Sequence, residues 1–268
     1  MTVDRVKGHI EAAKIESGRL ESRLRAMSPE DLARASACDR WQVRDVVAHL
    51  TFVVQFQRNM MARGLAGDDT MPGGARRRQA PDTPPMSEVI AQGAVSLREK
   101  LGNGLLDAFH QNYQEVFELV DSLGPNDYGK PCWHPWGPMT VADFVDLVVN
   151  ELAIHGWDAL SPLDSDYHID QAALPATLAI GGKTLARMAP SGPARFRFEL
   201  TDGGVMPDLI VGEKAPEEPS ATLRCNSEAL TLIACGRLKM EDAMASGRVV
   251  VSGDEALARE LGRGLTGL

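Results

Sequence analysis

One short stretch of the chain pairs two side chains that could act on a metal ion or a substrate. In NELAIHGWDAL, residues 150–160, Glu151 and His155 lie four positions apart in an otherwise apolar run. Residues at i and i+4 share one face of a helix, so the carboxylate and the imidazole are expected to project together. A buried carboxylate is costly unless it is paired or bound to a metal. This stretch alone leaves open a hydrogen-bonded Glu–His pair at a helix surface.

A second stretch offers a further metal ligand. DVVAHLTFVV, residues 45–54, places His49 in an apolar helical segment, where a single histidine is usually a hydrogen-bonded core residue. Helical bundles bind metals through side chains that project inward from facing helices. Two histidines and one glutamate form a known ligand set for catalytic zinc, with one coordination position left open. We therefore interpret His49, Glu151 and His155 as ligands of a divalent ion, although this donor set also suits other metals.

Each histidine has an aspartate near it on the same helix. Asp45 lies four residues before His49, and Asp158 lies three residues after His155. Either aspartate could hold the ring nitrogen that does not face the metal. The alternative for each is an electrostatic role at a helix end.

The elements that must position these residues are helices over roughly the first 160 residues. Ser28, followed by proline, starts a short helix, and Thr140 with Asp143 forms a capping box for the helix that ends near Leu160. Other helices are expected over about 1–26, 42–62 and 86–123, the last with a possible break at LGNG, 101–104. The Gly- and Pro-rich connector 124–138 is not expected to be helical. Several long helices with short connections predict a bundle.

The pattern changes after about residue 165. ARFRFEL, 194–200, alternates apolar and polar residues as a strand does, and strands are also expected near 205–212, 221–225 and 248–254, the last one buried. Helices are expected near 171–188, 227–238 and 255–265. We predict two domains, a helical bundle over 1–165 and a smaller α+β domain over 166–268.

Composition excludes several classes of function. The formal charge is −9, and the one dense basic cluster, Arg76 to Arg78, lies in a Gly/Pro-rich loop, so nucleic acid is not an expected partner. No signal peptide or membrane-spanning run is present in the sequence, and the four cysteines form no C-x-x-C motif. We expect a cytoplasmic protein with reduced thiols, in which Cys38 and Cys132 are small apolar fillers. We interpret His9, His110 and His168 as surface residues, and His134 and Trp136 as parts of a packed connector.

Two quoted stretches resemble a known family. CDRWQVRDVVAHL, 38–50, followed by NELAIHGWDAL is similar to the mycothiol-dependent maleylpyruvate isomerase family. The resemblance implies a DinB-like four-helix bundle, zinc bound by His49, Glu151 and His155, and a second domain that resembles sterol carrier proteins. CGRL, at 235–238, matches a helix end of that second domain, where the family's arginine, here Arg237, is implicated in activity.

The resemblance implies a zinc enzyme that activates the thiol of mycothiol against a small electrophile, as an isomerase or as an S-transferase. Arg237 would then bind an anionic group of the substrate or of the thiol. The chain departs from the family pattern at Asn150, where isomerase-like members tend to carry arginine, and at Gln42, where a threonine cap is common. The first departure leaves the substrate open, and the sequence does not indicate the oligomeric state.

Three other functions remain open at this point. A metal-bound hydroxide in the open position would make the protein a metal-dependent hydrolase. A sterol-carrier-like half that binds an apolar ligand, beside a structural metal, would make it a non-catalytic binding protein. The third possibility is a bundle with core histidines and no metal.

Overall fold

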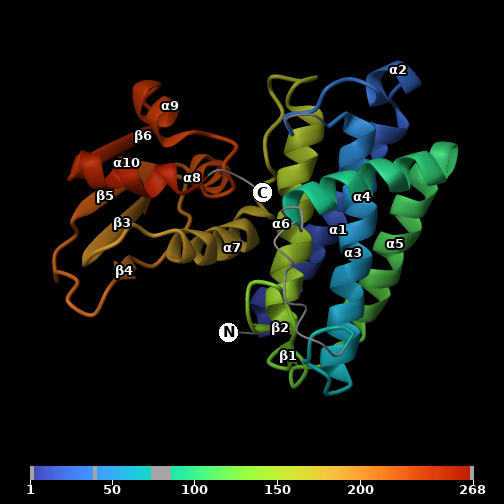
Figure 1. The fold of residues 1–268 in the computed structure, drawn as a ribbon, viewed down its shortest axis with the longest axis horizontal. Coiled ribbons are helices and arrows are strands. Elements are labelled where there is room, and N and C mark those ends of the chain that lie inside the picture. The colour runs from blue at the N-terminus through green and yellow to red at the C-terminus, as the bar shows by residue number, and fades with distance from the viewer. Residues whose placement is uncertain (1–2, 39–40, 74–85, 266–268) are drawn as a thin grey trace, which may run out of the picture. The chain divides into compact units, whose positions relative to one another are not determined.

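The computed structural model of the chain describes residues 3–38, 41–73 and 86–265. The chain divides into two compact units, Met1–His168 and Ile169–Leu268. The first is helical apart from one short hairpin, and the second combines helices with a four-stranded sheet (Figure 1). This arrangement confirms the predicted fold class.

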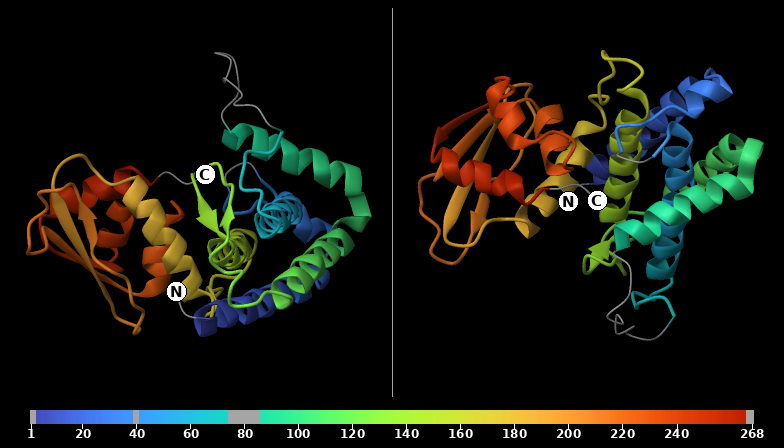
Figure 2. Two further views of the ribbon diagram at one scale, coloured as in Figure 1. Left: turned by 90° about the horizontal axis from the view of Figure 1, so that it is seen from below. Right: turned by 45° about the horizontal axis from the view of Figure 1, so that its top comes forward.

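Four long helices form the bundle of the first unit. α3 packs on α5 and α6, and α1 also packs on both of these, so the four helices close a ring around one core. α4 packs on α3 and runs across it rather than along it (Figures 1 and 2). The helices of this unit are α1 (Val3–Arg25), α2 (Pro29–Leu32), α3 (Val43–Leu65), α4 (Met86–Leu101), the 3₁₀ turn η1 (Gly102–Gly104), α5 (Leu105–Asp121) and α6 (Val141–Leu160).

Local signals start and interrupt these helices as the sequence predicts. The Thr140 hydroxyl accepts a hydrogen bond from Asp143 N (3.2 Å), and the Asp143 carboxylate accepts one from Thr140 N (2.9 Å), which closes the predicted capping box of α6. The Ser28 hydroxyl caps α2 in the same way through Asp31 N. The turn η1 separates α4 from α5 at the predicted break.

The bundle core is aliphatic and aromatic. Large side chains from all four long helices are almost completely buried in it: Leu20, Leu24, Leu50, Met61, Phe109, Tyr113, Phe144, Leu152 and Leu160. The connector after α5 contains a hairpin that the sequence did not predict, β1 (Pro131–Cys132) paired antiparallel with β2 (Met139–Thr140). This hairpin packs so closely on α3 that a Cβ at Gly64 would lie 2.5 Å from Cys132 Sγ.

The second unit is a sheet with helices packed against it. Its strand order is β4-β3-β5-β6, in which the central pair β3–β5 is parallel and the outer pairs are antiparallel. Helices pack against this sheet (Figure 2). Phe196, Phe198 and Leu223 are buried in the core of this unit, while Arg197 and Arg224, which alternate with them along the strands, are exposed. The elements are α7 (Leu174–Arg187), β3 (Ala194–Leu200), β4 (Leu209–Val211), β5 (Ala221–Cys225), α8 (Ser227–Ala234), α9 (Met240–Ala245), β6 (Val249–Gly253) and α10 (Glu255–Arg263).

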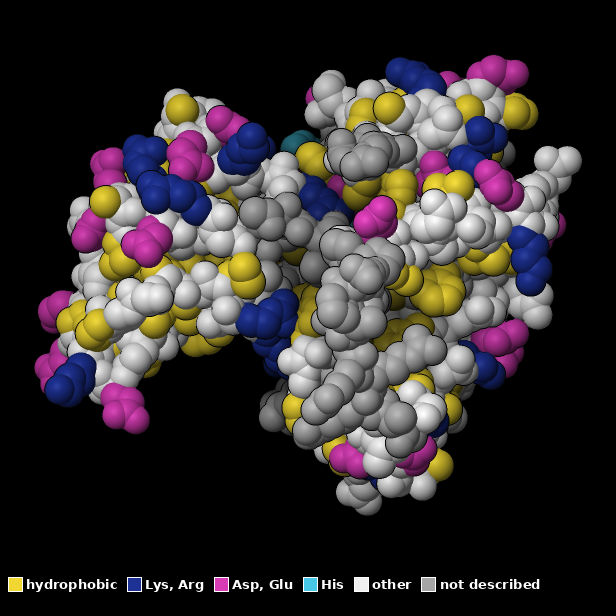
Figure 3. Space-filling view, in the orientation of Figure 1, with side chains coloured by type: hydrophobic (Ala, Val, Ile, Leu, Met, Phe, Trp, Pro, Cys, Tyr) yellow, Lys and Arg dark blue, Asp and Glu magenta, His cyan; other side chains and the backbone are white. Residues whose placement is uncertain are grey.

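Several predictions from the sequence concern the sheet edge and the surface. β6 lies at the edge of the sheet, and only Val249 is buried in it, so the expectation of a buried strand was wrong. The cluster Arg76 to Arg78 lies outside the described residues. On the face drawn in Figure 3, acidic and basic side chains are interspersed. None of the helices in the described ranges combines the length and the apolar character that crossing a bilayer requires.

Candidate metal centre

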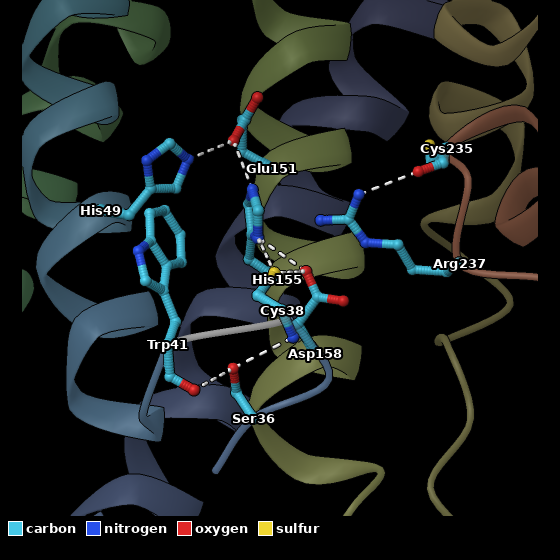
Figure 4. A network of polar contacts seen from close by, with 9 residues as sticks. All are labelled: Ser36, Cys38, Trp41, His49, Glu151, His155, Asp158, Cys235 and Arg237. Carbon is cyan, nitrogen blue, oxygen red and sulfur yellow. Dashed lines mark hydrogen bonds and ion pairs between the residues drawn. The ribbon is translucent and has the colours of Figure 1, made fainter. Parts of the chain in front are cut away.

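Three side chains from two helices meet at one carboxylate oxygen. Glu151 and His155 lie on the same face of α6, where His155 Nε2 is 3.3 Å from Glu151 Oε2. His49 reaches the same oxygen from α3, with its Nε2 at 3.2 Å. The two imidazole rings lie edge to face with their centroids 4.5 Å apart. The structure thus brings together the three residues that the sequence analysis selected as ligands (Figure 4).

His155 is held from behind by a buried aspartate. Its Nδ1 lies 2.8 Å from Asp158 Oδ2, and the Asp158 side chain is 0% exposed. This contact leaves Nε2 as the nitrogen that faces Glu151. Of the two roles that the sequence allowed for Asp158, support of the His155 ring and an electrostatic role at the helix end, the structure shows the first.

His49 has no such polar support. Asp45, the other candidate, instead accepts hydrogen bonds at the start of α3 from Gln42 N and forms an ion pair with Arg98 (both 2.9 Å). His49 Nδ1 is buried and has no hydrogen-bond partner among the described residues. An aromatic side chain takes the place of a polar one, because the Trp41 ring lies 5.2 Å from the His49 ring, centroid to centroid.

The charges in this cluster are set by burial and by the contacts just described. Burial raises the pKa of the Glu151 carboxyl, but hydrogen bonds with His155 and His49 outweigh burial and hold that pKa well below its usual range. Burial lowers the pKa of His155, yet hydrogen bonds with Asp158, Cys38 and Glu151 hold it well above its usual range. Burial and then the neighbouring His155 lower the pKa of His49. These directions favour the charged form of Glu151 and the neutral form of His49.

The separations of the ligand atoms, their chemistry and their access to solvent all fit a divalent cation. Ligand atoms around a tetrahedral ion with bonds of about 2.1 Å lie about 3.4 Å apart, close to the 3.2 and 3.3 Å separations observed here. Two imidazoles and one carboxylate are donors that zinc accepts. The Glu151 side chain remains 18% exposed, so the cluster is not sealed from solvent.

Cys38 extends the cluster on the side away from His49. Its Sγ lies 2.9 Å from Asp158 Oδ2 and 3.9 Å from His155 Nδ1. The expectation of a small apolar filler was therefore wrong for Cys38, because a fold contact 120 residues away supplies the thiol with a carboxylate acceptor. Cys38, His155 and Asp158 also lie close enough to form a second metal-binding group, but His155 Nδ1 and the thiol are both directed at the same Asp158 oxygen.

Arg237 belongs to the second unit. It follows Gly236, whose φ of 70° ends the turn after α8, and its Nη1 donates a hydrogen bond to Cys235 O at 2.9 Å. The residue is half-buried. These contacts describe its local setting and leave its functional role a prediction.

The structure also tests the predicted locations of three other histidines. His9 is 5% exposed, and its Nδ1 lies 2.6 Å from the buried Asp146 carboxylate, so its reading as a surface residue was wrong. His110, with a side chain that is 49% exposed, is at the surface as predicted. His134 packs against Phe144 and Trp136 with ring centroids 5.7 and 4.9 Å apart, as predicted for a packed connector, whereas Trp136 itself is 37% exposed.

Comparison with known proteins adds independent findings. A family model described as the mycothiol maleylpyruvate isomerase N-terminal domain matches residues 13–160, and one described as the C-terminal domain of the same proteins matches residues 172–260. The chain shares its fold with the crystal structures of the mycothiol-dependent maleylpyruvate isomerase and of a point mutant of that enzyme. Each comparison has a TM-score of 0.63 and covers 92% of both chains, at 14% and 13% sequence identity. No curated protein matches the chain.

Proposed function

This chain belongs to the mycothiol maleylpyruvate isomerase family, and from that premise we propose that it is an enzyme that binds Zn²⁺ through His49, Glu151 and His155 and activates the thiol of mycothiol. The observation that carries the proposal is the meeting of two imidazoles from different helices at one carboxylate oxygen, at 3.2 and 3.3 Å. Its substrate is a small electrophile.

A bound zinc ion lowers the pKa of a coordinated thiol and so supplies a thiolate, the form of sulfur that attacks electrophiles. Residues of the chain would hold the ion and orient its ligands. Glu151 provides one negative charge and shares its oxygen between both rings. Asp158 fixes the His155 ring so that Nε2 faces the site. Trp41 lies 5.2 Å from His49 and 6.4 Å from His155, ring centroid to centroid, and so packs beside both rings.

The fate of the sulfur adduct separates the two reactions that this site supports. In an isomerisation, mycothiol adds to a cis double bond conjugated to a carbonyl, the new single bond rotates, and loss of the thiol gives the trans product. In an S-transfer, the carbon–sulfur bond is retained. Asn150, beside Glu151, is 9% exposed and its Oδ1 has no hydrogen-bond partner within the described ranges. Because isomerase-like members tend to carry arginine at this position, we include both reactions in the proposal.

The test combines metal analysis with mass spectrometry of reaction mixtures containing mycothiol and either maleylpyruvate or an alkylating electrophile. The wild type should contain about one zinc per chain and give thiol-dependent product. His49→Ala should lose both properties, whereas His110→Ala, which removes an exposed imidazole, should keep both. Wild-type protein without metal would contradict the proposal, and so would turnover that needs no thiol, which would instead indicate hydrolysis.

We assign Arg237 to the binding of an anionic group of the substrate or of the thiol. A guanidinium can form a bidentate pair with a carboxylate, whereas a methionine of similar length cannot. Arg237→Met should therefore keep the metal content of the wild type and raise KM for the anionic reactant by about tenfold or more. Arg224→Met, on the outer face of the sheet, is the matched control. An unchanged KM for both reactants would contradict this assignment.

A further inference from the structure

The segment between α2 and α3 is fastened to the end of α6. Ala37 N donates a hydrogen bond to Asp158 O (2.8 Å), so the backbone of this segment contacts the last turn of α6 directly. Within the segment, the Ser36 hydroxyl accepts from Cys38 N (3.1 Å) and donates to Trp41 O (2.9 Å). These bonds fix the backbone on both sides of residues 39–40. Cys38 is therefore held beside α6 by main-chain contacts, independently of its own side chain.

The thiol of Cys38 shares an acceptor with the metal-ligand candidate His155. Cys38 Sγ lies 2.9 Å from Asp158 Oδ2, and His155 Nδ1 lies 2.8 Å from the same oxygen (Figure 4). A completely buried carboxylate that accepts two donors on one oxygen is restrained against rotation about its side-chain torsions. The position of the His155 ring depends on that carboxylate because the ring has no other contact at Nδ1 shorter than 3.9 Å among the contacts given above.

We propose that Cys38 is a positioning residue for the metal site: its thiol donates to Asp158 Oδ2 and thereby orients the carboxylate that holds His155. The inference rests on the proposed function, since it assigns a role toward the bound metal. It differs from a nucleophilic role, because the thiol lies 2.9 Å from a carboxylate acceptor, while the imidazole nitrogen that could take its proton lies 3.9 Å away. Removal of a residue that hydrogen-bonds a metal-ligating histidine typically weakens metal binding by about 10- to 100-fold. Cys38 contacts Asp158 rather than the histidine itself, and it does so through a weak S–H donor, so we expect a smaller loss of metal affinity when it is replaced.

Three substitutions of Cys38 separate its donor function from its volume. Cys38→Ser keeps a donor, whereas Cys38→Ala and Cys38→Val lack one, and valine keeps apolar bulk. The measurement is the dissociation constant for Zn²⁺ by competition with a chromophoric chelator, on variants whose unfolding curves match the wild type. We expect Cys38→Ala and Cys38→Val to weaken Zn²⁺ binding by about three- to tenfold, and Cys38→Ser to stay within about twofold of the wild type. Equal affinity in all four proteins, or equal weakening in all three variants, would overturn the inference.

A double-mutant cycle tests whether Cys38 acts through Asp158. In an Asp158→Ala background the thiol has no carboxylate to orient, so adding Cys38→Ala should leave the Zn²⁺ affinity unchanged. Additive losses would show that Cys38 acts by another route and would overturn the inference. If the proposed function itself were wrong, the wild-type protein would bind no Zn²⁺ at all, which differs from both outcomes of the cycle.

Labelling of thiols gives a readout that does not depend on activity. Burial raises the pKa of Cys132 to about 11 and that of Cys225 to about 12, so both thiols react slowly with iodoacetamide, whereas Cys38 and Cys235 are half-exposed. Alkylation confirmed at Cys38 by peptide mass should accelerate the release of Zn²⁺ to a chelator. Cys38→Ser should be insensitive to the reagent, and Cys235→Ser should respond as the wild type does. Unchanged release from protein alkylated at Cys38 would contradict the inference.

Discussion

The two helices that supply the metal-ligand candidates support their histidines by different means. On α6, His155 has a polar chain behind it, in which Asp158 binds Nδ1 and Cys38 binds Asp158. On α3, His49 Nδ1 is buried without a hydrogen-bond partner in the described part of the chain, and the ring is flanked by Trp41. One ring is therefore oriented by hydrogen bonds and the other by packing.

The difference follows from where each aspartate lies on its helix. Asp45 is at the third position of α3, where it accepts from Gln42 N and pairs with Arg98, so its oxygens serve the helix start. Asp158 is in the last turn of α6, where the backbone N–H groups already have helical partners and the carboxylate is available to His155. Similar spacing from a histidine thus gives two different roles. At the N-terminus of α3, the carboxylate caps the helix rather than supporting the histidine.

The largest effect is expected where the two helices meet. Glu151→Gln removes the negative charge that both rings approach, and it should weaken Zn²⁺ binding by more than about 100-fold, beyond the range typical of an outer partner. The measurement is zinc content after dialysis, together with the dissociation constant. Glu118→Gln, on the exposed face of α5, is the control and should bind as the wild type does. Full zinc content in Glu151→Gln would show that the cluster is not the metal site.

Next in size is the polar support on α6. Asp158→Asn keeps the shape of the side chain but removes the charge that holds His155, and Zn²⁺ affinity should fall by about 10- to 100-fold. Chelator competition measures the change. An affinity within about twofold of the wild type would mean that both histidines are held by packing, and the contrast between the helices would disappear.

The matched substitution on α3 should affect stability instead. Asp45→Asn weakens the contact with Gln42 N and leaves the Arg98 guanidinium, with a side chain that is 19% exposed, without its 2.9 Å ion-pair partner. We expect the free energy of unfolding to fall by about 1–2 kcal/mol, as measured by denaturant titration. Zn²⁺ affinity should stay within about twofold, because neither oxygen contacts His49. A larger loss of affinity than of stability would assign Asp45 to the metal site after all.

The residues that the sequence placed correctly share a local signature. Glu151 and His155 lie on one helical face by spacing alone, and Thr140 with Asp143 announces the start of that helix. His49 lies in an apolar helical stretch and was selected because a second such stretch carries Glu151 and His155. The helix start and the Glu151–His155 pair need only the few residues around them, whereas the choice of His49 needs two stretches taken together.

The residues that the sequence missed depend on contacts between distant segments. Cys38 meets its carboxylate 120 positions away, and His9 meets Asp146 from another helix. Neither residue has a local pattern that indicates a buried polar partner. The hairpin β1–β2 was missed for another reason, since each strand has two residues and is too short for an alternating pattern.

The smallest effect is expected from the aromatic support on α3. Aromatic contacts of this kind contribute about 0.5–1.5 kcal/mol, which corresponds to about a two- to tenfold change in affinity. Trp41→Ala should therefore weaken Zn²⁺ binding by that factor, and Trp41→Phe should recover most of it, because an aromatic ring remains in the position from which Trp41 contacts both imidazoles. Trp136→Ala, in the connector, controls for the loss of an indole elsewhere in the first unit. If Trp41→Phe were as weak as Trp41→Ala, the indole would act through its N–H rather than its ring, and α3 would rely on polar support as α6 does.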